Sequence, residues 1–189
     1  MGDIEFGSSR RSDSATSDSG PEGTACDLEF RSLRRSDRAI SPKAAHDILI
    51  SGIFGCLGVK GDKGYPYVVP LNYVYDAEHN RIYFHSALEG YKLDAIKCDD
   101  RVCFCVVTNA QVLPNEISMR FDSVICFGRA SIVEGREKEY ALRMLVQKYI
   151  LGKATITSED VSEYVERHIR RTAIVRIDVE HLTGKSRPE

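Results

Sequence analysis

Apolar and polar residues alternate over several short stretches of the chain, which is the pattern of half-buried β-strands. Val68 to Tyr75 is rich in β-branched and aromatic residues, and Arg81 to His85 resumes the pattern. Asp76 to Asn80, between these stretches, supplies turn-forming residues. Val68 to His85 is therefore predicted to be a β-hairpin, whose first strand extends back to Tyr65.

Four further stretches are predicted strands. Phe54 to Lys60 precedes the hairpin, and Arg101 to Thr108 is almost continuously apolar, as in a strand covered on both faces. Ser123 to Val133 contains Gly128, where a bulge or a bend is expected. Thr172 to Val179 alternates and is predicted to be the last strand.

The connections favour an antiparallel sheet, because most of them have the length of a hairpin loop. Asn109 to Phe121, which contains Pro114, is predicted to be an irregular loop. Five or six strands are expected. Closure of the sheet into a small barrel would remove its exposed edges.

Helices are predicted where the apolar spacing changes to three and four residues. One begins with Ser41 as a cap and Pro42 at the first helical position. The others are expected over Tyr91 to Lys97, over Glu137 to Tyr149 and onward from Ser158. The predicted fold class is mainly β with peripheral helices.

Composition limits the class of protein. The chain has 189 residues, 42% of them hydrophobic, and a formal net charge of -2, which suits one domain and argues against a nucleic-acid-binding protein. No apolar run is long enough for a membrane span, and the first residues lack the regions of a signal peptide. We expect residues 1–32 to be a disordered tail, residues 33–189 to be one domain, and the protein to be soluble and cytoplasmic.

Six cysteines are present, and five of them lie within or beside apolar stretches. Cys103 and Cys105 would share one face of a strand, but no second pair with the spacing of zinc ligands accompanies them. Buried reduced thiols are expected, in preference to a metal or redox site.

Polar residues gather where the predicted hairpin ends and the next helix begins. Ser86, Gly90 and Lys92 bring a hydroxyl, a glycine and a lysine to the start of the helix at Tyr91. Free backbone N–H groups and the helix dipole favour an anion there. A serine cap with a nearby exposed lysine is the simpler alternative explanation.

Five segments together resemble a known superfamily. They read GYPYVVPLNYVYD, IYFHSALEGYKLDAI, RVCFCVV, SVICFGRASIV and HLTGKS. In this order they are similar to the flavin-binding split-barrel superfamily, and within it to the nitroimidazole-resistance (Nim-type) proteins related to pyridoxamine phosphate oxidase. The resemblance spans about Leu33 to Arg187 and implies a split β-barrel of antiparallel strands that binds FMN.

The resemblance also implies a site in a cleft between the two subunits of a homodimer. Residues at the matching positions would line the isoalloxazine ring (Pro70, Leu71 and Asn72), follow the ribityl chain and the phosphate (His85 and Ser86, with Gly90 after them), grip the phosphate (Tyr91 and Lys92) and reach the flavin from a strand start (Ser123).

Two departures from the family pattern alter the expectation. Tyr91 stands where an arginine is usual and cannot supply a bidentate charged contact, so the phosphate would depend on Lys92, Ser86 and backbone N–H groups. The chain also has no tryptophan and lacks the C-terminal substrate segment of the pyridoxamine phosphate oxidases. That oxidase activity is therefore not expected.

These features lead to one main functional hypothesis and two alternatives. The main one is a homodimeric FMN oxidoreductase that passes electrons from a reduced nicotinamide to a small acceptor, a nitro-aromatic compound or a quinone, with His85 as a catalytic proton donor. A structural, hydrogen-bonded His85 is the competing interpretation. The alternatives are a flavin- or haem-binding carrier or sensor, with His85 or His168 as an axial ligand, and an interaction protein with an empty barrel.

Overall fold

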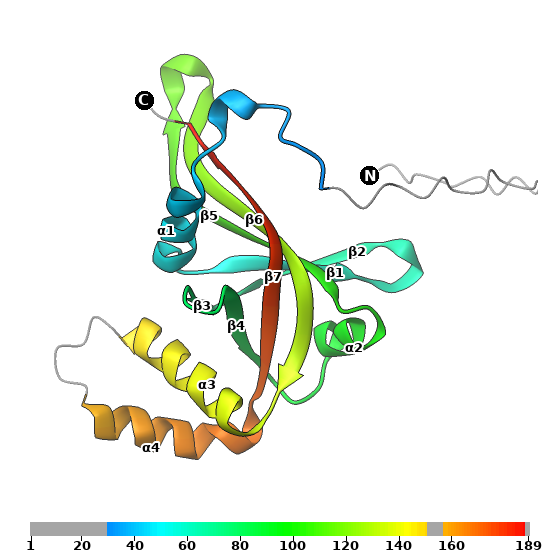
Figure 1. Ribbon diagram of the computed structural model, residues 1–189, viewed down its shortest axis with the longest axis vertical. Helices are drawn as coiled ribbons and strands as arrows, with labels where there is room; N and C mark the ends of the chain where they lie inside the picture. Colours follow the sequence, from blue (N-terminus) through cyan, green and yellow to red (C-terminus); the bar gives the residue numbers. More distant parts are fainter. Residues whose placement is uncertain (1–29, 151–156, 188–189) are drawn as a thin grey trace, which may run out of the picture. The chain divides into compact units, whose positions relative to one another are not determined.

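Figure 1 shows the computed structural model of the chain, which describes residues 30–150 and 157–187. One unit runs from Ser32 to Glu189, and the architecture below is that of its described residues. The predicted N-terminal tail lies outside the described residues as far as position 29, and so does Cys26.

Seven antiparallel strands form one sheet, in the order β2-β1-β5-β6-β7-β4-β3. Their bounds are β1 Gly55–Lys60, β2 Pro66–Leu71, β3 Tyr73–Asp76, β4 Arg81–Ser86, β5 Arg101–Leu113, β6 Ser118–Val133 and β7 Ala173–Ser186. Four α-helices surround it: α1 Pro42–Ser51, α2 Tyr91–Cys98, α3 Gly135–Ile150 and α4 Ser158–His168. The predicted fold class, mainly β with antiparallel strands and peripheral helices, is confirmed.

The sheet closes on itself at Asn72. The strands β2 and β3 lie at the two ends of the strand order, yet only Asn72 separates them in the sequence. Two consecutive peptide units span at most about 7 Å, so the two edges of the sheet must meet at this residue. They meet without pairing, since β2 pairs only with β1 and β3 only with β4. The result is a barrel that is split beside Asn72.

The split overturns the prediction of one strand from Tyr65 to Tyr75. β-propensity continues through this stretch, but its two halves pair with different partners, so the ladder is broken at Asn72. The predicted hairpin survives as β3 and β4 alone.

Tyr149, on α3, satisfies the backbone groups that the split leaves open. Its hydroxyl accepts a hydrogen bond from the N–H of Tyr73 at 2.8 Å. It can donate its own hydrogen to the carbonyl of Ile53 at 2.6 Å or to that of Tyr73 at 3.0 Å. A hydroxyl has one hydrogen, so the shorter contact to Ile53 is the better donor bond. Tyr149 thus fastens α3 to the open edge of β3.

Replacing Tyr149 with phenylalanine should lower the free energy of unfolding by about 1–3 kcal/mol, because the N–H of Tyr73 loses its partner at a part-buried position. Urea unfolding followed by circular dichroism measures the change. Tyr164→Phe is the matched control, since no hydrogen bond involves its hydroxyl among the described residues. An unchanged midpoint for Tyr149→Phe would contradict the role assigned to it.

The prediction of an irregular loop over Asn109 to Phe121 is wrong. The strands β5 and β6 extend into it, and a tight turn at Pro114–Glu116 joins them. Both faces of this hairpin are largely exposed, and its exposed residues include apolar ones such as Val112 and Met119, so no buried face distinguishes its strands from a loop. The last strand is also longer than predicted, because β7 continues to Ser186. With β2 and β3 separate, the sheet has seven strands where five or six were expected.

The predicted bulge at Gly128 is confirmed. The pairing of β6 with β7 shifts between Phe127 and Gly128, so that Glu180 is the extra residue on β7. A Cβ at position 128 would overlap the carbonyl oxygen of Asp178, which explains why glycine occupies this bend.

The helices α1, α2 and α4 begin where the sequence predicts, and α3 begins two residues earlier, at Gly135. The Ser41 hydroxyl accepts a hydrogen bond from the N–H of Ala44 at 3.2 Å, with Pro42 at the first helical position of α1. A reciprocal capping box between Thr157 and Asp160 opens α4. No helix within the described ranges combines the length and the apolar character required to cross a bilayer.

Two hydrophobic clusters hold these elements together. One lies inside the curved sheet and includes Leu49 of α1, Leu93 of α2 and Phe104 of β5. The other joins α3 and α4 to β3, β4 and β7 through residues such as Leu145, Val165 and Tyr83. Figure 1 shows α3 and α4 as a two-helix layer at the end of the sheet formed by β3 and β4. This second layer shapes the site described next.

The five described cysteines are free thiols. Cys126 is buried, and burial raises its pKa to about 12. The expectation of buried thiols is wrong for the other four: Cys56, Cys103 and Cys105 are half-buried, and Cys98 is exposed because it ends the short helix α2 on the solvent side. Among the residues that the structure describes, no group of three or more histidine, cysteine or carboxylate side chains is placed to hold a metal ion.

Candidate functional site

Three of the predicted phosphate-binding residues lie close together in the sequence around the start of α2. Ser86 ends β4, Gly90 caps α2, and Lys92 lies in its first turn. The Oγ of Ser86 is buried and has no hydrogen-bond partner. A buried hydroxyl without a partner is unusual in a native protein and indicates that a ligand or a water completes it.

Gly90 makes the turn that leads from β4 into α2. Its φ of 135° is unfavourable for residues with a side chain, although nothing would obstruct a Cβ there. Glycine is therefore required by the backbone conformation and not by lack of space. The N–H of Leu93 in the first turn already donates to the carbonyl of Gly90 at 2.9 Å. The amides left for an anion are therefore those of Tyr91 and Lys92.

His85 lies next to Ser86 but faces the opposite side of β4. Ser86 follows Phe84 on the side of the first cluster, whereas His85 follows Tyr83 on the side of α3. The protein atoms around its partly exposed side chain lower the pKa of His85, and the positive charge of Lys92 lowers it further. The neutral imidazole is therefore favoured at neutral pH.

A cavity of about 520 Å³ opens between this end of the sheet and the two-helix layer. Its lining combines two predicted site residues with residues of or beside α3 and α4, namely Asn72, His85, Leu142, Leu145, Val146, Tyr149, Ile150, Tyr164, His168 and Thr172. The wall is largely apolar, with a few polar groups that converge on it, as in sites for small organic molecules.

His168 presents a defined nitrogen at this cavity. Its Nδ1 lies 2.7 Å from the backbone carbonyl oxygen of Tyr164, and its ring stacks on the Tyr164 ring with centroids 4.0 Å apart. A carbonyl oxygen only accepts, so Nδ1 carries the proton in this contact. The neutral ring then leaves Nε2 without a proton, able to accept a hydrogen bond or to bind a metal.

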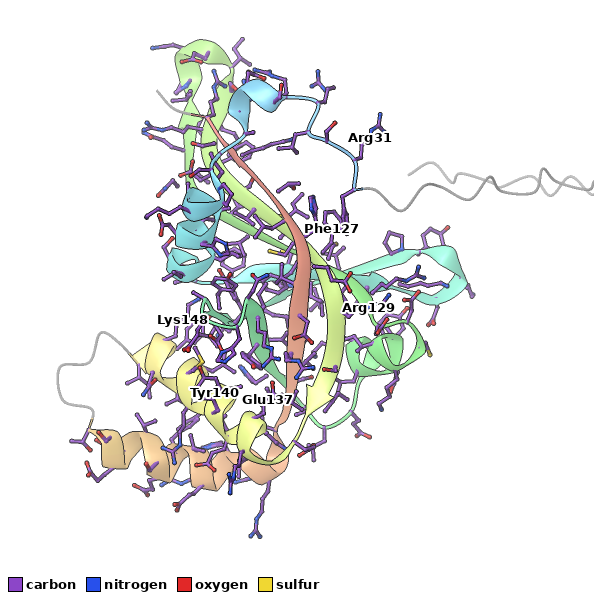
Figure 2. All side chains as sticks on the ribbon, in the orientation of Figure 1. Arg31, Phe127, Arg129, Glu137, Tyr140 and Lys148 are labelled. Atoms are coloured by element: carbon purple, nitrogen blue, oxygen red, sulfur yellow. The ribbon has the colours of Figure 1, made fainter. Side chains whose placement is uncertain are left out.

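A lysine with a buried amino group precedes the cavity residue Tyr149 on α3. Figure 2 shows Lys148 on α3, beside the end of the sheet that carries β3. Its Nζ is buried without a hydrogen-bond partner and lies 3.9 Å from the centroid of the Tyr73 ring. Burial lowers the pKa of Lys148 to about 8, and the ring face partly compensates its charge.

The remaining predicted site residues lie on the other side of the split. Pro70 is exposed, while Leu71 packs against the first cluster and offers only its backbone to a ligand. Pro70 begins a row of paired residues that crosses β1, β5 and β6 through Cys56, Cys105 and Ile125. Ser123 lies on the same outer face of the sheet, two residues before Ile125.

The Tyr91 side chain contacts the turn between β1 and β2. Its hydroxyl accepts a hydrogen bond from the N–H of Asp62 at 2.5 Å, and its ring meets the edge of the Tyr67 ring at a centroid distance of 4.6 Å. It therefore supports the turn between β1 and β2. The contribution of Tyr91 to a phosphate site stays a prediction.

Sequence reasoning named His168 only as an alternative haem ligand and did not identify the rest of the α3 and α4 side of the cavity. Tyr164 and His168 are four residues apart on one helix, so they were expected on one face, but nothing local shows that this face meets Asn72 and His85. The only local signal was a pair of polar aromatic residues at helical spacing.

Comparisons with solved structures agree with this architecture. A candidate 5-nitroimidazole antibiotic resistance protein from Bacteroides thetaiotaomicron is 25% identical, with a TM-score of 0.63 over 78% of this chain and 85% of that one. An FAD-binding protein from Mesorhizobium loti is 20% identical, with a TM-score of 0.59 over 80% and 98%. The flavocytochrome Anf3 from Azotobacter vinelandii is 20% identical, with a TM-score of 0.65 over 84% and 73%.

Comparison at the level of sequence identifies the family. No curated protein matches the chain. The model of the pyridoxamine 5'-phosphate oxidase family matches residues 41–186, which include every strand and all four helices of the fold. The chain belongs to the pyridoxamine 5'-phosphate oxidase family, whose split-barrel fold it shares.

Proposed function

We propose that the protein binds FMN and passes electrons from a reduced nicotinamide to a small acceptor. The observation that carries the proposal is the buried, unpartnered hydroxyl of Ser86 beside the start of α2. The next residue toward the N-terminus, His85, lines a cavity large enough for an organic molecule. The proposed anion site at Ser86 and the apolar cavity at His85 thus lie on opposite faces of β4, at its C-terminal end.

The residues present fit a flavin mononucleotide. Ser86, Lys92 and the first amides of α2 would hold the phosphate, because they offer a hydroxyl, a cation and free N–H groups. Asn72, at the split, and the backbone of Pro70 and Leu71 would orient the ring. The bound flavin would supply the two-electron redox chemistry.

The cavity between β4 and the α3–α4 layer would take the acceptor. Its apolar wall suits a small aromatic compound, of the nitro-aromatic or quinone type, and would limit the access of water. His85 would hold a proton at the boundary between the flavin residues and the cavity. The similarity to a candidate nitroimidazole resistance protein supports this acceptor class.

The oxidation of NADH and NADPH by the FMN-loaded protein tests the activity directly. We expect turnover that depends on an added nitro-aromatic or quinone acceptor, and we expect Leu145→Trp, which fills the cavity, to reduce it at least tenfold while FMN stays bound. Turnover that the tryptophan leaves unchanged would contradict the placement of the acceptor.

A homodimer is part of the proposal. The outer face of the sheet exposes Val68 by 60%, Val107 by 46% and Ile125 by 39%, side by side with the half-buried Cys105. Apolar patches of this kind usually mark an interface. Pairing of two such faces would place Pro70 and Ser123 at the boundary between subunits.

Light scattering after gel filtration should therefore give twice the mass of the chain. Ile125→Asp should yield monomers, because it introduces a charge into the centre of the apolar face, whereas Arg170→Asp, which is exposed on a different element, should not. A monomeric mass for the wild type at micromolar concentration would contradict the proposed homodimer.

The neutral state of His85 predicts a pH dependence of stability. Its pKa is lowered in the folded protein, so the unfolded chain binds more protons as the pH falls through about 6.5. The wild type should therefore lose stability between pH 7 and pH 5 more steeply than His85→Gln. Thermal melts of the cofactor-free proteins across this range measure the difference, and parallel curves would contradict the assigned shift.

A haem-binding carrier or sensor is the second candidate. The observation that favours it is that His85 and His168 line the same cavity, with the Nε2 of His168 unprotonated in the neutral ring. The fold similarity to a flavocytochrome is compatible with it. An intense Soret band that His168→Ala abolishes would support this candidate, whereas haem titration without a Soret shift would exclude it.

A further inference from the structure

A group of basic residues lies at the C-terminal end of β7, away from the cavity. It forms a pocket of about 200 Å³ between the short helical turn Ser36–Arg38 and the last residues of β7. Five of its seven lining residues are basic, and the full set is Arg34, Arg35, Arg38, Phe121, Lys185, Ser186 and Arg187. We call it the arginine pocket.

Backbone contacts fix the two sides of the arginine pocket. The N–H of Ile40 donates to the carbonyl of Gly184 at 3.3 Å, and Ala39 forms an isolated bridge with Lys185. On the other side, the N–H of Arg187 donates to the carbonyl of Phe121 at 3.3 Å. The basic side chains are thus anchored to the sheet and are not part of an unattached tail.

Only part of this positive charge is neutralised within the chain. Arg35 makes a bidentate pair with Asp37, at 2.8 and 2.6 Å, and Arg187 contacts Glu116. Within the described ranges, Arg34, Arg38 and Lys185 form no ion pair. Three cations of the described part of this pocket therefore lack a direct ion pair, and Asp37, which interacts electrostatically with Arg38, is already paired with Arg35.

An anion would offset the repulsion among these like charges. Arg38 and Lys185 are half-buried, so they have lost part of their hydration, and the like charges repel one another. The chain as a whole is slightly acidic, with a net charge of -2, so the cluster is a local feature of this pocket. A bound anion would relieve both penalties.

We propose that the arginine pocket binds the phosphate or diphosphate group of a small molecule. Guanidinium groups match phosphate oxygens in pairs, and the Ser186 hydroxyl and the Phe121 ring add a donor and an apolar surface. A concave site of this size suits one small anionic group. Nucleic acids and membrane surfaces are instead bound through extended basic faces.

This pocket is separate from the anion site at Ser86 in the same chain. Ser86 pairs with Ala173 at the start of β7, whereas Lys185 lies at its far end. From position 173 to position 185, an extended strand spans up to about 40 Å. Figure 1 shows β7 running the length of the sheet between these two ends, so we take the arginine pocket as a second anion site.

Titration calorimetry of the FMN-loaded full chain with inorganic pyrophosphate at low salt tests the proposal. We expect saturable binding that weakens as salt is added, and at least a tenfold loss of affinity in Arg34→Gln/Arg38→Gln. The control, Arg136→Gln/Arg170→Gln, removes the same charge from two exposed positions outside the pocket and should change the affinity less than twofold.

Three results would overturn the proposal. They are no binding of pyrophosphate to the wild type, equal weakening in the control variant, and loss of bound FMN from Arg34→Gln/Arg38→Gln. The last would assign the pocket to the cofactor phosphate. Since FMN content is measured separately from pyrophosphate binding, failure of the proposed function and failure of the second site are distinguishable.

Comparing the affinities for NADPH and NADH identifies which molecule supplies the phosphate group. Tighter binding of NADPH that disappears in Arg34→Gln/Arg38→Gln would identify the 2'-phosphate of the nicotinamide donor as the ligand. Equal binding of both nucleotides, lost in the same variant, would identify a diphosphate. Affinity for either nucleotide that the variant leaves unchanged would exclude the pocket as the nucleotide site.

Discussion

Replacing Lys92 with alanine is expected to weaken FMN binding by about 10- to 100-fold. A hydrogen bond to a charged group contributes about 1.5–3 kcal/mol, and Lys92 is the one cation in the first turn of α2. Quenching of FMN fluorescence on titration with cofactor-free protein measures the affinity. Lys97→Ala, which removes the same charge from the last turn of α2, should bind FMN like the wild type.

The Ser86→Ala variant tests whether the Ser86 hydroxyl binds a ligand or stabilises the fold. The Ser86 hydroxyl has no partner, so its removal should leave the cofactor-free protein as stable as the wild type, or more stable by up to about 1 kcal/mol. FMN affinity should fall at the same time. Destabilisation of the cofactor-free protein with unchanged FMN affinity would mean that the hydroxyl serves the fold.

Gly128→Ala is expected to lower the free energy of unfolding by about 3 kcal/mol. The added Cβ would overlap the carbonyl oxygen of Asp178, a backbone atom held in the β6–β7 ladder, so the bend of the barrel itself must open. Urea denaturation monitored by tyrosine fluorescence gives the change.

The neighbouring position supplies the control for Gly128. Arg129→Ala removes an exposed side chain that pairs with Asp100 and Glu180, and it should alter stability by about 1 kcal/mol or less. Equal midpoints for Gly128→Ala and the wild type would show that the bend is not fixed by close packing.

Much of the fold follows from local patterns. Alternation located the strands, and caps such as Ser41 with Pro42 located the helices, because these signals depend on neighbouring residues. The split at Asn72 does not follow from a local pattern. Leu71 and Tyr73 both lie in strands, and only their pairing partners, β1 and β4, distinguish them. The hairpin at Pro114 was also missed, because polar and apolar residues alike are exposed on both of its faces.

The candidate site also has one part that local sequence predicts and another part that it does not. Ser86, Gly90 and Lys92 are close in sequence, so their meeting at α2 was predictable from spacing and helix chemistry. The cavity joins Asn72 to His168, and the arginine pocket joins Arg38 to Lys185. Contacts between residues so far apart depend on tertiary packing, which no local pattern encodes.

The most direct test of the central claim is the identity of the chromophore in freshly purified protein. An absorption spectrum, followed by acid release and chromatography, should give the two flavin bands and free FMN in a ratio near one per chain. A colourless protein that takes up no added FMN would contradict the assignment of Ser86 and Lys92 to a flavin phosphate site.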